Sequence, residues 1–439
     1  MTDSRITRRA ALKTAAAGFT APFALRSFAT AAPSETVRHA SFGASGMAGQ
    51  DIRALTASKH LKLVAVADVD QHNSAWIKKE FPGCRIYDDY RALLDKEKNL
   101  DSVNVSTPDH MHAPIAMTAM QRGLHVYGQK PLTQTIYEAR RLTEVAGEKK
   151  LVTQMGIQIH SHPVHKQVVE LVHAGAIGKV QEVHSWSGKS WGDTTPKPAQ
   201  KDAPPAGFDW DKWLGVAAER PFIGGEYYHP GNWRKRLDFG TGTFGDMGCH
   251  ILDPVFGALG VGNPLTIRSE LPGPNAYNWS LDVQAKYVFP GTPYTTGTVG
   301  LTWYNGGARP PREIQSLVGG RISDQGSIYI GTGGVMYSPY IGNPVLLPTD
   351  RFREYKRPTV KGDDHYLQFV EAVRGNGTTS APFSYAGPLT EMVLLGCLAT
   401  RFPKTDLKWD TKALKITNVE EANQYVRKIY RKGWEVDGL

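Results

Sequence analysis

The chain of 439 residues has only three cysteines, Cys84, Cys249 and Cys397, which lie far apart. An odd number of widely spaced cysteines provides neither a disulfide framework nor a zinc ligand set. The chain also lacks a strong excess of charge of one sign. Its formal net charge is +9, and it contains no dense run of Lys or Arg. Five basic groups and one acidic group in residues 1–31 account for +4 of that charge, which leaves +5 for the remainder. This mild excess gives no reason to expect a nucleic-acid partner.

Residues 1–31 are typical of a targeting segment rather than of a folded domain. Residues 7–13 (TRRAALK) fit a twin-arginine export signal, a weakly apolar stretch follows at 14–25, and Ala29-Thr30-Ala31 fits a cleavage site. The apolar stretch is too short to span a bilayer, so no stable membrane span is expected. An ordinary basic arm is the alternative. The expected location is the periplasm or another extracytoplasmic space.

Strands and helices alternate over the first part of the remaining chain. Residues 61–68 (LKLVAVAD) form a near-continuous apolar run, as expected for a parallel strand buried on both faces. Such alternation predicts a doubly wound parallel sheet of the Rossmann type over residues 32–157. Strands are predicted at 37–42, 61–68, 101–106, 124–128 and 151–156, and helices at 47–58, 73–81, 109–122 and 133–148.

The pattern changes after residue 158 and predicts a second domain over residues 158–439. Strands followed by helices favour a large, open, mostly antiparallel sheet with helices on one face, so the whole chain combines an α/β with an α+β domain. We assign substrate binding and oligomerisation to this second domain. Its expected elements are a helix at 163–173, strands at 180–186, 281–288 and 296–303, and helices at 364–374, 388–401 and 419–431.

A glycine-rich turn, Gly43-Ala44-Ser45-Gly46-Met47-Ala48-Gly49, joins the first strand to the first helix. Small residues at this place let a backbone approach a dinucleotide pyrophosphate, which the helix N-terminus then favours. The match to G-x-G-x-x-G/A is imperfect, since Ser45 replaces the second glycine and Ala48 the third. A purely structural glycine turn is the alternative.

Asp68 ends the second strand, 25 residues after Gly43. A carboxylate at this place accepts hydrogen bonds from the adenosine ribose and repels a 2′-phosphate. The sequence therefore favours NAD over NADP as the cofactor. Asp70 is the alternative if the strand ends later.

Three further segments carry a family resemblance. They are Thr107-Pro108-Asp109-His110-Met111-His112, Gln129-Lys130-Pro131 and Asp246-Met247-Gly248-Cys249-His250. In order and spacing they resemble the glucose–fructose oxidoreductase / inositol dehydrogenase (Gfo/Idh/MocA) family over residues 37–439. The family usually has Glu-Lys-Pro, so Gln129 is a departure. With the resemblance, the residues expected at the cofactor are Gly43, Ser45, Gly46, Met47, Asp68, Thr107, Pro108, His112, Gln129 and Lys130.

Lys130 is the first expected catalytic residue. It follows a strand at its C-terminal end, where open α/β sheets bind ligands, and Pro131 disfavours a helical conformation for it. The resemblance implies that this lysine binds the reacting hydroxyl and helps to move its proton. A surface lysine at a turn is the alternative.

Asp246 and His250 lie four residues apart, so on a helix they share one face, which Asp253 extends to i+7. A histidine suits proton removal from an alcohol, and a neighbouring carboxylate orients its ring. The resemblance assigns the base role to His250 and substrate contact to Asp246. A helix-capping aspartate and a core histidine are the alternatives.

Aromatic and basic side chains gather from the end of the predicted strand at 180–186 onward. Such side chains suit the binding of sugar rings or, equally, a protein interface. The residues expected at the substrate are Trp186, Tyr228, Trp233, Arg234 and Asp246. His160, His162 and His165 are irregularly spaced with no carboxylate nearby in sequence, so no metal is expected.

These residues lead to three hypotheses of function. The first is an NAD-dependent oxidoreductase that acts on a secondary hydroxyl of a sugar or polyol, with a tightly bound cofactor. The second is a redox-neutral glycosidase that takes a hydride and returns it. The third is a non-catalytic sugar-binding protein. The resemblance also implies a homo-oligomer, a dimer or a tetramer.

Overall fold

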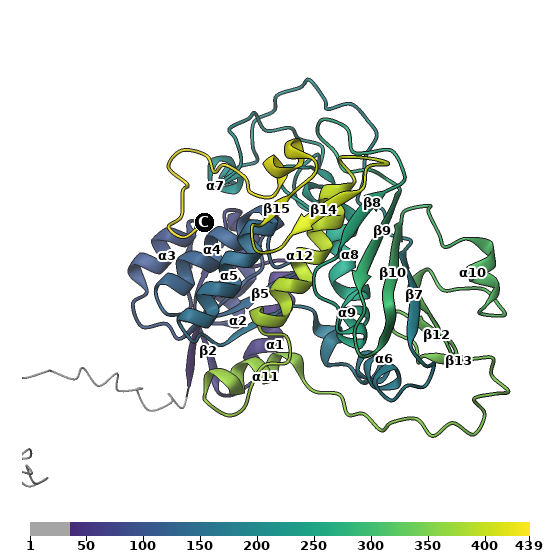
Figure 1. Ribbon diagram of the computed structural model, residues 1–439. Coiled ribbons are helices and arrows are strands. Elements are labelled where there is room, and N and C mark those ends of the chain that lie inside the picture. Colours follow the sequence, from purple (N-terminus) through teal and green to yellow (C-terminus); the bar gives the residue numbers. More distant parts are fainter. Residues whose placement is uncertain (1–35) are drawn as a thin grey trace, which may run out of the picture. The chain divides into compact units, whose positions relative to one another are not determined.

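A computed structural model describes residues 36–439, so the predicted export signal lies outside the described residues. The first sheet is parallel, with strand order β3-β2-β1-β4-β5-β6 (Figure 1). This order is that of a doubly wound Rossmann sheet, as predicted. Its strands are β1 (Val37–Phe42), β2 (Leu61–Ala67), β3 (Arg85–Tyr87), β4 (Ser102–Val105), β5 (His125–Gly128) and β6 (Thr153–Met155).

Two helices of this part, α3 and α5, begin at local capping signals. Thr135 and Glu138 form a capping box at the start of α5, and the Asp89 side chain caps α3. The strand β3 and the helix α3 were not predicted, because both are short and three-residue β3 is not fully buried. The helices are α1 (Met47–Thr56), α2 (Ala75–Glu80), α3 (Tyr90–Lys96), α4 (His112–Gln121) and α5 (Ile136–Glu148).

The second sheet has the order β13-β12-β11-β7-β10-β9-β8-β14-β15, and only β7 and β10 pair in parallel. The prediction of a large, mostly antiparallel sheet is therefore confirmed. Its strands are β7 (Val180–Ser187), β8 (Thr266–Ser269), β9 (Val283–Pro290), β10 (Thr295–Asn305), β11 (Gln325–Gly331), β12 (Gly334–Pro339), β13 (Val345–Leu347), β14 (Leu407–Asp410) and β15 (Lys415–Ile416).

Helices α8 (Gly242–Ile251), α9 (Asp253–Leu259) and α12 (Phe383–Ala399) lie between the two sheets (Figure 1). Helix α12 is buried along most of its length and packs against α5, α8 and β8, so one apolar core is continuous between the sheets. The other helices are α6 (Pro163–His173), α7 (Trp210–Leu214), α10 (Arg312–Ser316) and α11 (His365–Val373).

Two predicted helices differ from the structure. Helix α12 begins at Phe383, five residues before the predicted start, and contains Pro388 near its N-terminal end. The predicted helix at 419–431 is wrong, because only Glu420–Tyr425 is helical, as a 3-10 helix. Its side chains alternate between buried and exposed too irregularly to bury one helical face, since only Ala422 is buried.

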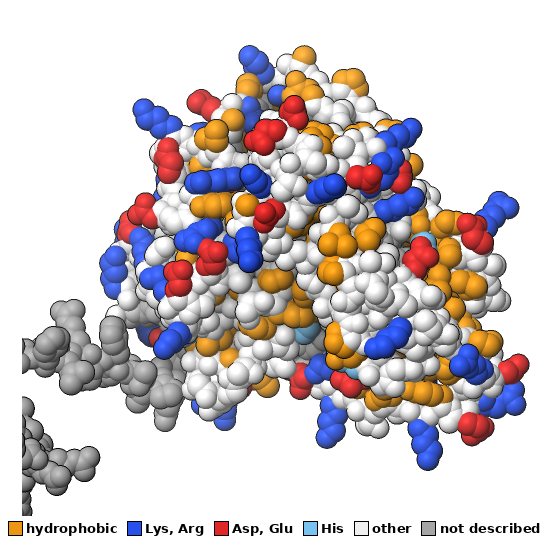
Figure 2. Space-filling model, viewed as in Figure 1, with side chains coloured by type: hydrophobic (Ala, Val, Ile, Leu, Met, Phe, Trp, Pro, Cys, Tyr) orange, Lys and Arg blue, Asp and Glu red, His pale blue; other side chains and the backbone are white. Residues whose placement is uncertain are grey.

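The visible surface carries acidic and basic side chains interspersed with one another rather than gathered in a basic strip (Figure 2). Within residues 36–439, no helix is both long and apolar enough to cross a membrane.

Candidate active site

A cavity of about 380 Å³ lies where the glycine turn, the ends of β4 and β5, and the start of α8 meet. Gly43 has a φ of 97°, and a Cβ atom there would lie 2.6 Å from the Ser106 carbonyl oxygen, so only glycine fits. Gly46 stands at the N-cap of α1, which has no side-chain cap and no acidic residue in its first turn. The uncapped helix end is open to an anion, which fits the pyrophosphate of a dinucleotide.

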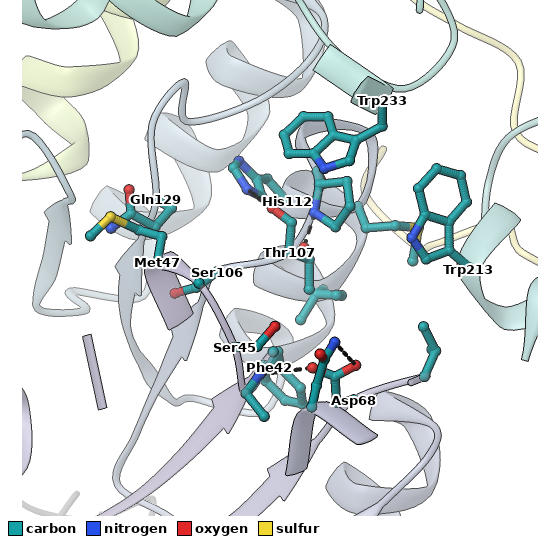
Figure 3. A pocket seen from close by; sticks show the side chains of 18 of the residues that line it. Phe42, Ser45, Met47, Asp68, Ser106, Thr107, His112, Gln129, Trp213 and Trp233 are labelled. Carbon is teal, nitrogen blue, oxygen red and sulfur yellow. Dashed lines mark hydrogen bonds between the residues drawn. The ribbon is translucent and has the colours of Figure 1, made fainter. Parts of the chain in front are cut away.

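Asp68 follows β2 and lines the same cavity (Figure 3). Its carboxylate accepts hydrogen bonds from the backbone N–H groups of Ala44, at 2.9 Å, and Asp70, at 2.9 Å. Burial raises the pKa of Asp68, while these N–H donors oppose the shift. Asp68 therefore holds the glycine turn in place and lies at the cavity wall where a ribose is expected.

The other predicted cofactor residues lie on the loops that follow β4 and β5. Thr107, Pro108, His112, Gln129 and Lys130 all line the cavity, as do Ser45 and Met47 of the turn. The two ring nitrogens of His112 each lie 2.7 Å from a carbonyl oxygen, one of Thr107 and one of Pro131. His112 thus joins the two loops. Figure 3 shows Thr107, His112 and Gln129 together with Trp213 and Trp233, which come from the predicted second domain and line the same cavity.

Gln129, which stands where the family usually has a glutamate, has a buried hydrogen-bond partner in the structure. The Gln129 amide nitrogen donates to both oxygens of Asp51, at 3.0 and 2.9 Å, and its amide oxygen accepts from the Lys130 N–H at 3.2 Å. Asp51 is fully buried in α1 and also accepts from Ser106 and Tyr366. A glutamate at position 129 would place a second carboxylate against Asp51, so a neutral amide is what this buried acid requires.

Asp51 makes the stability of the protein depend on pH. Burial raises the pKa of Asp51 from 3.8 to about 6, against the hydrogen bonds from Ser106, Gln129 and Tyr366. The folded state therefore binds the proton of the Asp51 carboxyl group more tightly than the unfolded state does. The resulting contribution of Asp51 to the free energy of unfolding is full below pH 4 and is lost as pH rises through 6. We expect the free energy of unfolding of the wild type, relative to Asp51→Asn, to fall by about 3 kcal/mol over that window.

Urea unfolding at a series of pH values measures this difference, and any constant effect of the amide cancels in the pH dependence. A wild type and an Asp51→Asn variant with parallel pH profiles would contradict the buried, weakly acidic state of Asp51.

Lys130 and Asp246 form the polar centre of the cavity. The Lys130 Nζ lies 2.6 Å from the Asp246 Oδ1 and 3.1 Å from the Asp246 carbonyl oxygen. Burial favours the neutral acid, but the charges of Lys130 and Arg234 outweigh it and hold the pKa of Asp246 below its usual range. The pair is therefore ionised, and Lys130 is a cation that points a donor at the cavity.

His250 lies one turn after Asp246 on α8, as predicted, but it does not line the cavity. Its Nδ1 atom is buried without a hydrogen-bond partner, and its ring packs 6.1 Å from that of Tyr340. Burial, with the charge of Lys130 added, lowers the pKa of His250 to about 3. The ring is therefore neutral at physiological pH, and the same burial and charge make it a weak base in the free protein.

Asp253 does not extend the Asp246–His250 face. Leu252 separates α8 from α9, and Asp253 starts the new helix ahead of Pro254, which cannot continue the old one. Its buried carboxylate instead accepts from His160, at 2.9 Å, and from Tyr385, at 2.7 Å, with His165 at 3.6 Å. The expectation that no carboxylate joins these histidines is thus wrong, although residues 36–439 contain no group of three or more His, Cys, Asp or Glu side chains placed so that they could hold a metal ion.

The aromatic residues predicted at the substrate divide into two groups. Trp233 and Arg234 line the cavity, and the Arg234 guanidinium lies 4.2 Å from the Trp233 ring. Tyr228 does not reach the cavity, because it is 2% exposed within an aromatic cluster around Trp213 and Phe239.

Trp186 does not reach the cavity either. Side chains of β7 alternate between the two faces of the sheet, so Val183 faces the main core and Trp186 the opposite side. There it stacks on Tyr337, with ring centroids 6.3 Å apart, beneath the segment of α10. The prediction that Trp186 binds substrate is corrected accordingly.

Two residues near Asp246 were not predicted. The Trp191 indole N–H donates to the Asp246 Oδ2 at 2.9 Å, and the Lys189 Nζ lies 3.9 Å from the same oxygen. Both belong to the loop at 188–207, which follows β7. The sequence could have indicated them, because a lysine and a tryptophan follow the end of a strand. The segment was instead predicted to be a loop because it is rich in proline and glycine.

An uncapped glycine turn on a parallel sheet, with an acid after the second strand, defines a dinucleotide-binding Rossmann protein. A model of the Gfo/Idh/MocA oxidoreductase family with NAD-binding Rossmann fold matches residues 37–157, and a model of the family's C-terminal alpha/beta domain matches residues 159–284. Together the two models cover more than half of the chain. The chain therefore belongs to the Gfo/Idh/MocA oxidoreductase family.

The chain is 34% identical over 151 residues to a dTDP-3,4-didehydro-2,6-dideoxy-alpha-D-glucose 3-reductase of Streptomyces violaceoruber, a match over 34% of this chain and 44% of the relative. It is 31% identical over 124 residues to inositol 2-dehydrogenase 4 of Saccharopolyspora erythraea, over 28% of this chain and 36% of the relative. These matches span less than half of each relative.

A solved structure supports the fold of almost the whole chain. The WlbA dehydrogenase of Bordetella pertussis, in complex with NADH and UDP-GlcNAcA, superposes with a TM-score of 0.60 at 13% identity. The match covers 85% of this chain and 99% of that one.

Proposed function

We propose that this protein is an oxidoreductase that transfers a hydride between a nicotinamide cofactor and a secondary hydroxyl carbon of a sugar or polyol. The observation that carries the proposal is the ionised Lys130–Asp246 pair in the same cavity as the uncapped glycine turn. Relatives named for action on a deoxysugar nucleotide and on inositol support the substrate class.

The nicotinamide ring supplies the hydride acceptor when the cofactor is bound. Lys130 donates a hydrogen bond to the substrate oxygen and stabilises the negative charge that develops there as the hydride leaves the carbon. Because its Nζ pairs with the Asp246 carboxylate at 2.6 Å, we assign Lys130 a hydrogen-bond donor role and not the first uptake of the hydroxyl proton. His250, one helical turn from Asp246 but outside the cavity lining, is the residue that the family resemblance leads us to propose as the acceptor of that proton.

We further propose NAD rather than NADP as the cofactor, on the position of Asp68. Asp68→Ala is expected to weaken NAD binding by about 10- to 100-fold, the effect of losing hydrogen bonds to a charged acceptor, and to narrow the gap to NADP. Isothermal titration with both nucleotides measures this. Asp70→Asn is the matched control, because Asp70 does not line the cavity and its variant should keep the wild-type preference.

A wild type that already prefers NADP would overturn the role of Asp68. The same titration on Asp68→Asn separates charge from structure, since the amide can still accept one backbone hydrogen bond of the glycine turn.

We also propose that the protein is exported by the twin-arginine route with its cofactor already bound, and that the cofactor is recycled in place. Residues 1–31 support the route, and outside the cytoplasm no NAD pool would replace a cofactor that dissociates. We expect about one nucleotide per chain after purification without added cofactor and passage through a desalting column. Absorbance after denaturation measures it. A chain that emerges without nucleotide would defeat tight binding.

The redox-neutral glycosidase remains the second candidate. Turnover of a glycoside without any added hydride acceptor would favour it, and stoichiometric reduction of NAD would favour the dehydrogenase. The resemblance also supports a dimer or tetramer, which light scattering of the purified protein would test.

A further inference from the structure

Three cations surround the Asp246 carboxylate: Lys130 and Arg234 line the cavity, and Lys189 lies on the loop that follows β7. The Asp246 carboxylate lies 2.6 Å from the Lys130 Nζ, 3.7 Å from the Arg234 Nε and 3.9 Å from the Lys189 Nζ. Over residues 36–439, none of these three cations has another carboxylate within ion-pair distance. One negative charge therefore meets three positive charges.

Two of these cations lie too far from the carboxylate for a hydrogen bond, Arg234 at 3.7 Å and Lys189 at 3.9 Å. The Asp246 Oδ1 pairs with Lys130, and its Oδ2 accepts from the Trp191 indole at 2.9 Å. Asp109, another acid that lines the cavity, is buried and accepts a hydrogen bond from Thr241, and burial raises its pKa. Arg234 and Lys189 thus share the Asp246 carboxylate with Lys130 and have no other ion pair among the described residues.

These two side chains are also accessible to a ligand. The Arg234 side chain is 29% exposed and the Lys189 side chain 49% exposed, whereas Asp246 is 9% exposed. The Arg234 guanidinium lies between the rings of Trp233, at 4.2 Å, and Trp191, at 5.4 Å. This packing holds a planar fork of donors at the cavity wall, a geometry that suits a carboxylate.

We propose that the substrate is an acidic sugar whose carboxylate binds Arg234 and Lys189 while one of its hydroxyl groups lies at Lys130. This inference rests on the proposed function and names its substrate class as a uronic acid. The positive charge of Arg234 and Lys189 attracts the carboxylate of such a sugar.

The test measures binding, so that it does not depend on turnover. Tryptophan fluorescence of the NADH-loaded protein is titrated with methyl glycosides of three matched pairs: glucuronate and glucose, galacturonate and galactose, mannuronate and mannose. At least one uronate is expected to bind about 10-fold or more tightly than its neutral partner, and the gap should shrink as salt is raised.

Variants identify the residues that cause the preference. Arg234→Gln and Lys189→Gln should each reduce the difference in affinity between a uronate and its matched hexose. The affinity for the neutral sugar should change less. Lys235→Gln is the matched control, because it removes the same charge next to Arg234 from a side chain that, unlike Arg234 and Lys189, makes no ion pair with Asp246 among the described residues. Circular dichroism and NADH binding confirm that each variant is folded.

Equal or tighter binding of the neutral partner in all three pairs would overturn the inference. So would a uronate preference that persists in Arg234→Gln and Lys189→Gln, tighter binding of the corresponding sugar 6-phosphates, or an absence of uronate binding. The proposed function fails separately: a protein that prefers uronates but exchanges no hydride with them defeats the oxidoreductase, whereas one that oxidises only neutral sugars defeats the acidic substrate.

Discussion

Lys130→Ala is expected to lower kcat/KM by about two orders of magnitude or more, the usual effect of removing a group that acts on the reacting proton or oxygen. In this variant the cavity keeps Asp246, but no donor remains for the substrate oxygen. The fold should persist, because Asp246 still accepts from Trp191 at 2.9 Å and lies 3.7 Å from the Arg234 Nε. Activity is measured as the change in absorbance of the reduced cofactor.

Lys149→Ala is the control for Lys130→Ala, since it removes an exposed lysine at the C-terminal end of α5 that does not line the cavity. It should keep the wild-type rate and thermal stability. A folded Lys130→Ala protein with wild-type kcat/KM would remove Lys130 from the mechanism. Loss of cofactor binding together with activity would place its role in the cofactor site instead.

His250→Ala is expected to lower kcat by a similar factor of about 100 or more, because the hydroxyl proton then has no acceptor on α8. In the wild type, burial lowers the pKa of His250 from 6.5 to about 3, so the ring is already deprotonated throughout the neutral range. The acid limb of the wild-type kcat/KM profile should therefore lie well below pH 6.5 rather than at the ordinary histidine value.

His250→Gln is a useful companion variant, because it keeps a polar side chain of similar reach but cannot take up a proton. Recovery of activity in His250→Gln but not in His250→Ala would mean that the histidine positions neighbours such as Tyr340 rather than accepting a proton. Full activity in both variants would assign the proton to a different group.

Much of the first domain could be predicted from the sequence because its signals are local. The apolar run at 61–68 must be buried on both faces, and a glycine turn followed by a helix has few structural solutions. Lys130, at the end of a strand, and Asp246, on a helix, could be placed in the same way. Both line the cavity in the structure.

The rest depended on tertiary contacts that no local pattern encodes. Trp186 was placed at the substrate because of its residue type, but the alternation of β7 turns it to the other face of the sheet. The role of Asp51 needs Gln129 and Tyr366, which lie 78 and 315 residues away in the sequence. Asp253 likewise meets His160 only because α9 packs against α6 and the segment before it.

The most direct test of the central claim is a single-turnover measurement of hydride transfer. NAD-loaded protein at stoichiometric concentration is mixed with the uronate and hexose panel in a stopped-flow instrument, and absorbance of the reduced nicotinamide is recorded beside Lys130→Ala. The account predicts a rise toward one reduced cofactor per chain with at least one sugar, and a rise slower by about 100-fold in the variant. Saturated cofactor binding with no reduction by any sugar in the panel, or an equal rate in Lys130→Ala, would contradict it.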